Sequence, residues 1–201
     1  ERITTSITND LNLDRSEFFY LPGKVLHIDG DEDYLKRCMS FYKKLNIMAY
    51  GLCLKEVDIK TEIKSYLEKL SPDIVVITGH DAYYKRKGST DNVMNYKNTS
   101  NFIDAVKVAR NYEKNQDKLI IIAGACQSNY EELIKAGSTF ASSPKRINIH
   151  ALDPAIIASY LALYDRNKTV DLIDLLGKTK SGSEGIGGVV TKGCMFVGYP
   201  R

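Results

Sequence analysis

The chain has little of what marks several common protein classes. It holds four cysteines in 201 residues, none spaced as C-x-x-C, and its three histidines do not cluster with them. This pattern argues against a disulfide framework or a metal site and favours a reducing compartment. No uncharged apolar run approaches the roughly 18 residues of a membrane-spanning helix, and the first residues carry no signal-peptide core. We therefore expect a soluble protein with no membrane span.

An excess of charge of one sign is also missing. The net charge is +3, without a dense run of lysine or arginine, so nothing indicates a nucleic acid or an anionic membrane as partner. The glycines between residues 182 and 188 match neither a phosphate-binding loop nor a dinucleotide fingerprint nor G-x-S-x-G. We expect this segment to be structural.

What is present is a globular composition, 43% hydrophobic and 26% charged, with short apolar runs alternating with amphipathic segments. The runs predict strands at 24–28, 47–52, 73–77, 119–122 and 146–150. Helices are expected from a cap at Asp31, over 59–70, around 102–109, from a capping box at Ser128 to Gly137, from a cap at Asp153, and over 169–176. Residues 178–188 read as a flexible loop, and 189–197 as a terminal hairpin. The fold class is α/β, a three-layer sandwich with a mostly parallel central sheet over residues 21–201, preceded by a polar segment, 1–20.

Two reactive side chains follow neighbouring strands of this predicted sheet. His80 comes after the third strand and Cys126 after the fourth, 46 positions apart. Because the carboxyl ends of parallel strands share one edge, a thiol and an imidazole there could form a cysteine nucleophile with its general base. A helix start close to Cys126 favours the thiolate. The alternative is a buried core cysteine with no chemical role.

Several acidic residues are candidates for binding a basic substrate side chain. Asp29 follows the first strand, and a carboxylate at that edge could pair with a guanidinium. Asp31 and Asp153 are further candidates, although both also suit helix caps. His27 lies within the first strand and is expected in the core, whereas His150 ends the fifth strand and could reach the same crevice.

A strand ending in Gly-His and another ending in Ala-Cys resemble the caspase-like cysteine peptidases, which include caspases, gingipains, legumain and clostripain. Within that group, five stretches resemble a family of sporulation-specific proteases. These are PGKVLHIDGDE (22–32), VITGHDAY (76–83), AGACQS (123–128), FASSP (140–144) and RINIHALDP (146–154). The resemblance covers residues 20 to 200 approximately.

The resemblance implies an endopeptidase that needs no metal or organic cofactor and cleaves after basic residues, arginine above all. Cys126 would be the nucleophile and His80 the catalytic histidine. The group usually has His-Gly, whereas here Asp81 follows His80, so the backbone N–H groups of Cys126 and Asp81 are taken as the oxyanion hole. Asp29 is the first choice for the acid of the specificity pocket, ahead of Asp31 and Asp153.

The same resemblance implies the partners and the location. The substrates would be spore coat and cortex-lytic or germination-related precursor proteins, met in the cytoplasm of the sporulating mother cell or in the spore coat. The chain begins at Glu1 rather than Met, which suits a fragment or a processed form, and it ends at Arg201. Self-cleavage by an arginine-directed peptidase would leave such an end, and ordinary trimming would leave it equally well.

Two other functions stay open at this point. The alternating elements also resemble a phosphoacceptor receiver domain, which needs an aspartate at the end of its third strand, where this chain has Thr78 and Gly79. A structural spore coat protein on an inactive peptidase scaffold is the other alternative. Acetyl-phosphate labelling tests the first, and the alkylation rate of Cys126 tests the second.

Overall fold

The computed structural model describes residues 17–201, so most of the polar segment expected over residues 1–20 lies outside the described range. A six-stranded sheet runs through the centre in the order β3-β2-β4-β5-β6-β7. Its strands are β3 (Ala49–Cys53), β2 (Val25–Asp29), β4 (Ile74–Thr78), β5 (Ile120–Ala123), β6 (Phe140–Ser142) and β7 (Ile186–Gly188). All neighbouring pairs are parallel except β6–β7. The predicted α/β class with a mostly parallel sheet is confirmed.

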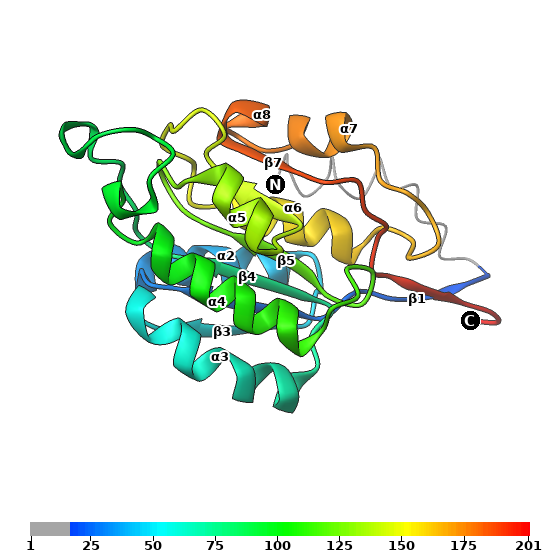
Figure 1. Ribbon diagram of the computed structural model, residues 1–201. Helices are drawn as coiled ribbons and strands as arrows, with labels where there is room; N and C mark the ends of the chain where they lie inside the picture. The colour runs from blue at the N-terminus through cyan, green and yellow to red at the C-terminus, as the bar shows by residue number, and fades with distance from the viewer. Residues whose placement is uncertain (1–16) are drawn as a thin grey trace.

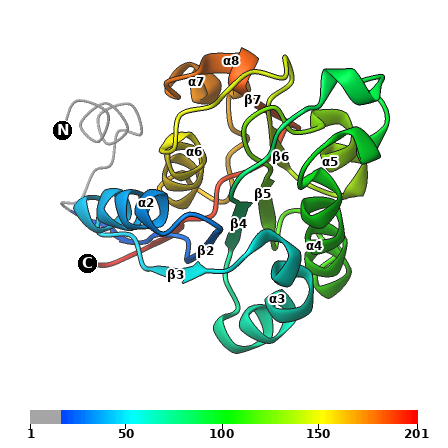
Figure 2. The ribbon, with the colours of Figure 1, turned by 90° about the vertical axis from the view of Figure 1, so that its left-hand side faces the viewer.

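Helices cover both faces of this sheet and complete three layers (Figure 2). One face carries α3 (Glu56–Leu70), α4 (Thr99–Tyr112) and α5 (Tyr130–Ala136); the other carries α2 (Glu32–Lys44), α6 (Asp153–Ala162) and α7 (Leu172–Gly177). The short helix α8 (Gly182–Gly185) precedes β7. Two 3-10 turns, η1 (Lys85–Lys87) and η2 (Val93–Asn95), lie in the long loop before α4. Within residues 17–201, no helix is long and apolar enough to cross a bilayer.

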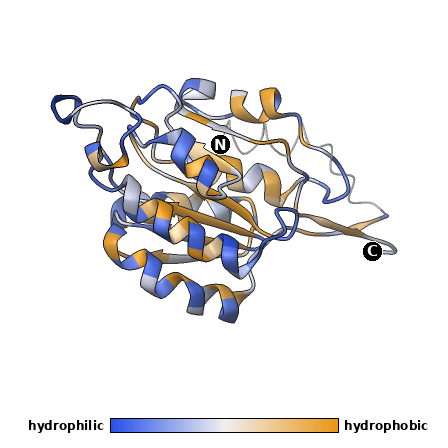
Figure 3. Cartoon of the chain, in the orientation of Figure 1, coloured by the Kyte–Doolittle hydropathy of each residue, from blue (hydrophilic) through white to orange (hydrophobic). Residues whose placement is uncertain are grey.

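The alternation of side chains along β2 decides which residues meet which layer. Leu26 and Ile28 pack into the cluster under α3 and α4, whereas Val25 belongs to the cluster under α2 and α6. Because side chains two residues apart share a face, His27 and Asp29 also project toward the α2 side. Every residue of β2 is buried, and Figure 3 shows the central strands as the most continuously hydrophobic part of the chain.

A two-stranded antiparallel ribbon extends from the sheet beside the C-terminus (Figure 1). It pairs β1 (Phe19–Leu21) with β8 (Phe196–Gly198). The terminal hairpin expected over 189–197 is therefore wrong, since β8 finds its partner near the start of the described chain. The predicted boundary between the polar N-terminal segment and the domain, between residues 20 and 21, falls inside β1.

The fifth strand expected over 146–150 is also wrong, because β6 occupies that place in the sheet. Arg146 has a left-handed φ of 55°, which interrupts an extended conformation at the start of the segment. The chain instead lies over the turn after β5, where Ile147 O accepts a hydrogen bond from Gln127 N. The glycine-rich stretch 178–188, expected as a loop, forms α8 and the antiparallel edge strand β7.

The helix boundaries follow some of the predicted end signals and depart from others. Asp31 caps α2 by accepting from Tyr34 N, and α5 ends at Gly137 as expected. The capping box at Ser128 is wrong by one position, because Asn129 provides the cap of α5. Asp153 is the first residue of α6 rather than its cap.

Candidate active site

The strand order brings the carboxyl ends of β2, β4 and β5 side by side, and a small cavity of about 60 Å³ lies there. The residues that line it are Asp29, Tyr34, Thr78, Gly79, Ala125, Cys126, Ile149, Ala151 and Pro154. The cavity therefore joins the first-choice specificity acid to the candidate nucleophile. Ile149 lies in the segment 146–150, where a fifth strand was expected, and forms part of the cavity wall.

Cys126 sits on a tight turn directly after β5. Gly124 and Gln127, on either side of it, both adopt left-handed backbone conformations, with φ of 104° and 60°. A side chain at Gly124 would meet Leu133 at 2.8 Å, so glycine is required there on both counts. The sulfur of Cys126 lies 3.3 Å from Ile149 N and 3.7 Å from Ile149 O. Within residues 17–201 the backbone N–H of Cys126 donates to no protein acceptor.

His80 lies at the same end of the sheet, half exposed, on the loop after β4. Its Nε2 is 3.1 Å from Oδ2 of Asp31, and its ring lies beside that of Tyr34, which lines the cavity. The imidazole is thus held by Asp31 and the sulfur of Cys126 by Ile149. Catalytic hydrogen bonds are often formed only in the substrate complex, so this arrangement is compatible with a dyad that closes on the substrate.

Asp29 forms a buried acidic wall of the cavity, with 2% of its surface exposed. Its Oδ1 accepts a hydrogen bond from Asp31 N at 2.9 Å. Burial, which penalises the charged form, raises the pKa of Asp29 to about 6, and the nearby carboxylates of Asp31 and Glu56 act in the same direction. A cation in the cavity would relieve this cost.

The other two acids predicted for substrate binding are engaged with the protein. Asp31 uses one oxygen to cap α2 and the other to hold His80. Asp153 is fully buried, and its carboxylate accepts hydrogen bonds from the backbone N–H groups of His150, Lys180 and Ser181. Asp153 therefore fixes the segment before α8 to the start of α6.

Asp81 is a buried anchor for the turn that carries Cys126. Its Oδ2 accepts from Thr99 Oγ1 and from Ser128 Oγ at 2.7 Å, and Ser128 Oγ in turn accepts from Ala125 N. Its Oδ1 accepts from Asn98 N. This explains why Ser128 does not cap α5. The carboxylate links the loop after His80 to the loop that contains Cys126.

Glu56, at the start of α3, is a residue of this site that the sequence reasoning missed. Its Oε1 accepts a hydrogen bond from the backbone N–H of His80 at 2.8 Å. Its carboxylate also lies so close to Gly79 that an added Cβ there would be 2.5 Å from Oε1. The only signal in the sequence is an acidic first turn, which most helices share, so nothing distinguished Glu56 from an ordinary helix-dipole partner.

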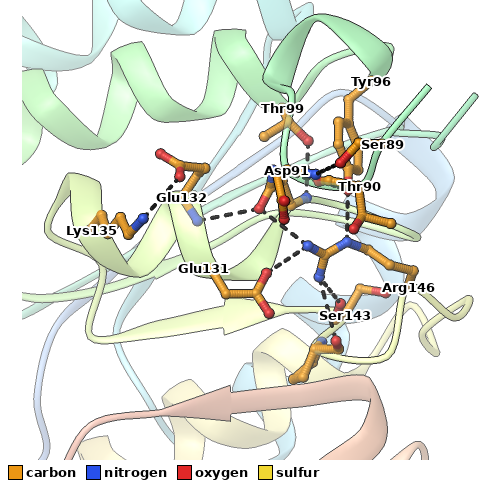
Figure 4. A network of polar contacts seen from close by, with 12 residues as sticks. Ser89, Thr90, Asp91, Tyr96, Thr99, Glu131, Glu132, Lys135, Ser143 and Arg146 are labelled. Carbon is orange, nitrogen blue, oxygen red and sulfur yellow. Dashed lines mark hydrogen bonds and ion pairs between the residues drawn. The ribbon is translucent and has the colours of Figure 1, made fainter. Parts of the chain in front are cut away.

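Arg146 holds the long loop before α4 against neighbouring segments through a network of polar contacts (Figure 4). The Arg146 guanidinium donates to Tyr96 Oη at 2.7 Å, to Glu131 Oε2 at 2.5 Å and to Asn129 Oδ1 at 3.2 Å. Tyr96 in turn donates to the carbonyl of Thr90. One partly buried cation therefore joins this loop, the start of α5 and the segment over Cys126.

The other two histidines lie in different surroundings: His27 is in the core and His150 is next to the cavity. His27 is fully buried, as expected, and its Nδ1 is 2.6 Å from Tyr42 Oη. His150 accepts a hydrogen bond from Leu152 N on its Nδ1, and burial together with the charge of Lys180 lowers its pKa. His150 adjoins Ile149 and Ala151, which line the cavity.

The fold and this end of the sheet define a class of protein: a three-layer α/β sandwich whose polar site lies beyond the carboxyl ends of parallel central strands. The chain belongs to the family described as YabG peptidase U57, whose model matches residues 2–200. It is 44% identical over 186 residues to the sporulation-specific protease YabG of Bacillus subtilis (strain 168). The match covers 92% of this chain and 64% of that relative, so the chain spans somewhat less than two thirds of the relative's length.

Proposed function

We propose that this protein is a cysteine endopeptidase of sporulation that cleaves its protein substrates after arginine. Membership of a peptidase family supports proteolysis, and the relative's name supports sporulation as its setting. The observation that carries the specificity is the shared cavity, in which a thiol and a buried carboxylate face the same small space. Spore coat and cortex-lytic or germination-related precursors, met in the mother cell or the coat, are the proposed substrates. We assign residues 21–201 to the caspase-like peptidase domain.

In the proposed mechanism the Cys126 thiolate attacks the scissile carbonyl carbon, and the resulting oxyanion accepts hydrogen bonds from backbone N–H groups. The N–H of Cys126 is available for this role, and so is that of Asp81, since neither has an acceptor within residues 17–201. Removing one donor of an oxyanion hole typically costs about 3 kcal/mol. The buried contacts of the Asp81 side chain hold both N–H groups in a fixed relation.

His80 transfers the protons. Because Asp31 engages Nε2, Nδ1 is the ring nitrogen left to exchange a proton with the substrate. Imidazolium gives its Nδ1 proton to the leaving amine as the C–N bond breaks, which leaves a thioester on Cys126. Water then attacks the thioester with His80 as base, and the carboxylic acid leaves as the C–S bond breaks. Asp31 thus serves in this proposal to orient His80 rather than to bind substrate.

Asp29 selects the basic side chain. A guanidinium can donate two parallel hydrogen bonds to a carboxylate, and its charge compensates a carboxylate whose ionisation burial disfavours. Asp153 is a weaker candidate for this role, because all its described hydrogen bonds go to backbone N–H groups of the protein.

The test is hydrolysis of matched fluorogenic peptides that differ only in Arg, Lys or Asp before the scissile bond. We expect the order Arg above Lys with no cleavage after Asp, and loss of all activity in Cys126→Ala. Cys53→Ser removes an exposed thiol that does not line the cavity and is expected to leave the rates unchanged. Cleavage by Cys126→Ala would contradict the nucleophile.

A second variant separates specificity from reactivity. In a Cys53→Ser background, Asp29→Asn should lower kcat/KM for the arginyl peptide at least 100-fold while the alkylation rate of Cys126 changes less than threefold, because the lost contact is a charged hydrogen bond to substrate. If kcat/KM and the alkylation rate fell equally, Asp29 would have no specific role in binding the arginine side chain. An inert Cys126 in the wild-type protein would favour the scaffold alternative, and labelling by acetyl phosphate would favour the receiver alternative.

A further inference from the structure

A buried polar line runs from α2 through β2 to the floor of the cavity. It begins at Tyr42, whose hydroxyl oxygen is 2.6 Å from His27 Nδ1, and continues through the imidazole to Nε2. Nε2 is buried and has no hydrogen-bond partner in the described chain, yet Asp29 Oδ2 lies 3.9 Å from it. His27 and Asp29 are two residues apart on one strand and share its α2 face. All three side chains are buried, with exposures of 0%, 0% and 2%.

An orphaned ring nitrogen in the core needs an explanation, since buried polar groups are nearly always paired. Burial lowers the pKa of His27 to about 3, so the imidazole is neutral and carries one proton. If Tyr42 donates its hydroxyl proton to Nδ1, that imidazole proton resides on Nε2 and points along the strand to Asp29. The distance of 3.9 Å is longer than a hydrogen bond, and closing it needs a displacement of about 1 Å.

We propose that His27 is a positioning residue for substrate specificity, which donates its Nε2–H to the ionised carboxylate of Asp29 and closes the gap to it when a guanidinium enters the cavity. This inference rests on the proposed role of Asp29. Asp29 Oδ2 then accepts from His27 while Oδ1 accepts from Asp31 N, and each oxygen keeps a lone pair for the guanidinium. Tyr42 fixes the tautomer that makes this donation possible. No group becomes charged other than Asp29, so the line acts as an oriented dipole rather than as an ion pair.

The titration of Asp29 depends on all groups packed around it. These are Asp31 after β2, Cys53 on β3, Glu56 on α3, His80 after β4, Cys126 after β5, and His27, Cys38 and Tyr42 toward α2. Asp31 and Glu56 raise the pKa of Asp29 and His80 lowers it. A neutral donor at His27 stabilises only the ionised carboxylate, so its removal raises the pKa of Asp29 further. Binding of arginyl substrate should then fail at a higher pH than in the wild type.

Three variants test the proposal by the pH dependence of KM for the arginyl peptide. His27→Leu removes the donor, His27→Gln keeps an N–H donor at a similar reach, and Ser159→Ala removes an unpaired buried hydroxyl elsewhere in the core on the same side of the sheet. We expect His27→Leu to raise KM about tenfold at pH 7.5, the size of one hydrogen bond to a charged group, and to move the acid limb of 1/KM upward by about one pH unit.

In the same assays kcat and the alkylation rate of Cys126 should change less than threefold, His27→Gln should recover most of the binding, and Ser159→Ala should match the wild type. An unmoved acid limb in His27→Leu, or equal losses in His27→Leu and Ser159→Ala, overturns the proposal. If the wild type itself shows no preference for arginine over a matched neutral residue, the proposed function fails and this inference fails with it. If the wild type prefers arginine but the acid limb of 1/KM does not move in His27→Leu, only the role of His27 is rejected.

Because His27→Leu leaves the Tyr42 hydroxyl without its partner, a measurement on the wild-type protein accompanies it. In ¹⁵N-labelled protein, titration with benzamidine as a guanidinium mimic should move the Nε2–H proton resonance of His27 downfield as the hydrogen bond to Asp29 forms. The Nδ1 resonance should keep the signature of an unprotonated acceptor. A His27 Nε2 signal that does not move while benzamidine inhibits cleavage overturns the proposal.

Discussion

At the scale of single residues, the site is built around a carboxylate that the protein holds at an energetic disadvantage. Asp29 is almost completely buried, and its pKa is raised to about 6 because burial penalises the charged form. Its hydrogen bond from Asp31 N offsets only part of this cost. The stability that such a group contributes in its protonated form is lost as the pH rises from its unfolded-state pKa through its raised folded-state pKa. The residue proposed to give specificity is therefore one that weakens the folded state near neutral pH.

This predicts a pH-dependent gain of stability in Asp29→Asn. Between the ordinary value of 3.8 and about 6, the ionisation of Asp29 removes stability progressively, and above pH 6 the loss is complete. The amide variant escapes this loss, so its free energy of unfolding should exceed that of the wild type by about 3 kcal/mol at pH 8 and by almost nothing at pH 4. Urea unfolding at both pH values measures the difference.

Asp33→Asn is the matched control, because Asp33 is an exposed carboxylate in the first turn of α2. Its effect should stay within about 0.5 kcal/mol at both pH values. If Asp29→Asn raised the free energy of unfolding equally at pH 4 and pH 8, the gain would come from packing of the amide and not from the lost ionisation.

The sequence was sufficient to predict which side chains follow the ends of neighbouring strands, but not what each one contacts. Cys126, His80 and Asp29 follow strands whose parallel arrangement could be inferred from apolar runs. Asp29 and Cys126 line one cavity, whereas His80 lies on the loop after β4 and contacts Asp31. The partner of His80 could not be inferred, because the contact with Asp31 depends on where the His80 loop turns. For the same reason Glu56 was missed, since its role depends on contacts with backbone far away in the sequence.

At the scale of elements, the start of α3 determines the path of the loop that carries His80. Glu56 accepts from His80 N and lies against Gly79, so the helix terminus and the loop fit together through one side chain. Acidic side chains near a helix N-terminus interact favourably with its dipole, which suits Glu56 to the first turn of α3. α3 therefore fixes the backbone at His80 through Glu56.

Replacing Glu56 should consequently impair turnover more than it impairs stability. In Glu56→Ala the His80 N–H loses its acceptor and the loop loses its support, so we expect kcat for the arginyl peptide to fall about tenfold while KM changes less than threefold. Glu56→Gln keeps an acceptor oxygen and should recover most of the rate. Steady-state kinetics of the purified variants measure both constants.

Glu62→Ala, an exposed position on the same helix, controls for changes in helix propensity. The positioning role would be refuted if Glu62→Ala lost as much turnover as Glu56→Ala, or if Glu56→Gln were as impaired as Glu56→Ala.

The fifth strand was predicted at the wrong place for two physical reasons. Residues 146–150 have the composition of a strand, but the left-handed backbone at Arg146 and the contacts of Ile149 with the Cys126 sulfur hold them as a cover over the site. The β6 strand that takes their place has only three residues, too few for an alternating pattern. Long strands such as β2 and β4 were predictable because burial on both faces makes them continuously apolar.

At the scale of the whole molecule, the β1–β8 ribbon and the central sheet differ in how deeply their strands are buried. The strands β2, β4 and β5 are buried along their full length between two layers of helices. The β1–β8 ribbon instead exposes large apolar side chains, with Leu21 at 55% and Phe196 at 51%. A stacking contact of the Arg166 guanidinium, 3.5 Å from the Phe196 ring, fastens β8 to the body. Isolated two-stranded ribbons are marginal in water, so the ribbon should open more easily than the sheet.

Native-state hydrogen exchange in low concentrations of urea should resolve these two units. Amides of β1 and β8 should exchange through local opening, with a smaller free energy and a weaker urea dependence than amides of β4 and β5, which should require global unfolding. Phe196→Ala should lower the protection of the ribbon further while leaving the central strands and KM for the arginyl peptide unchanged, because the cavity is lined from the other end of the sheet. Identical exchange free energies and urea slopes in β1, β8 and β4 would instead mean that the ribbon unfolds only with the sheet, and a raised KM in Phe196→Ala would mean that it supports the site.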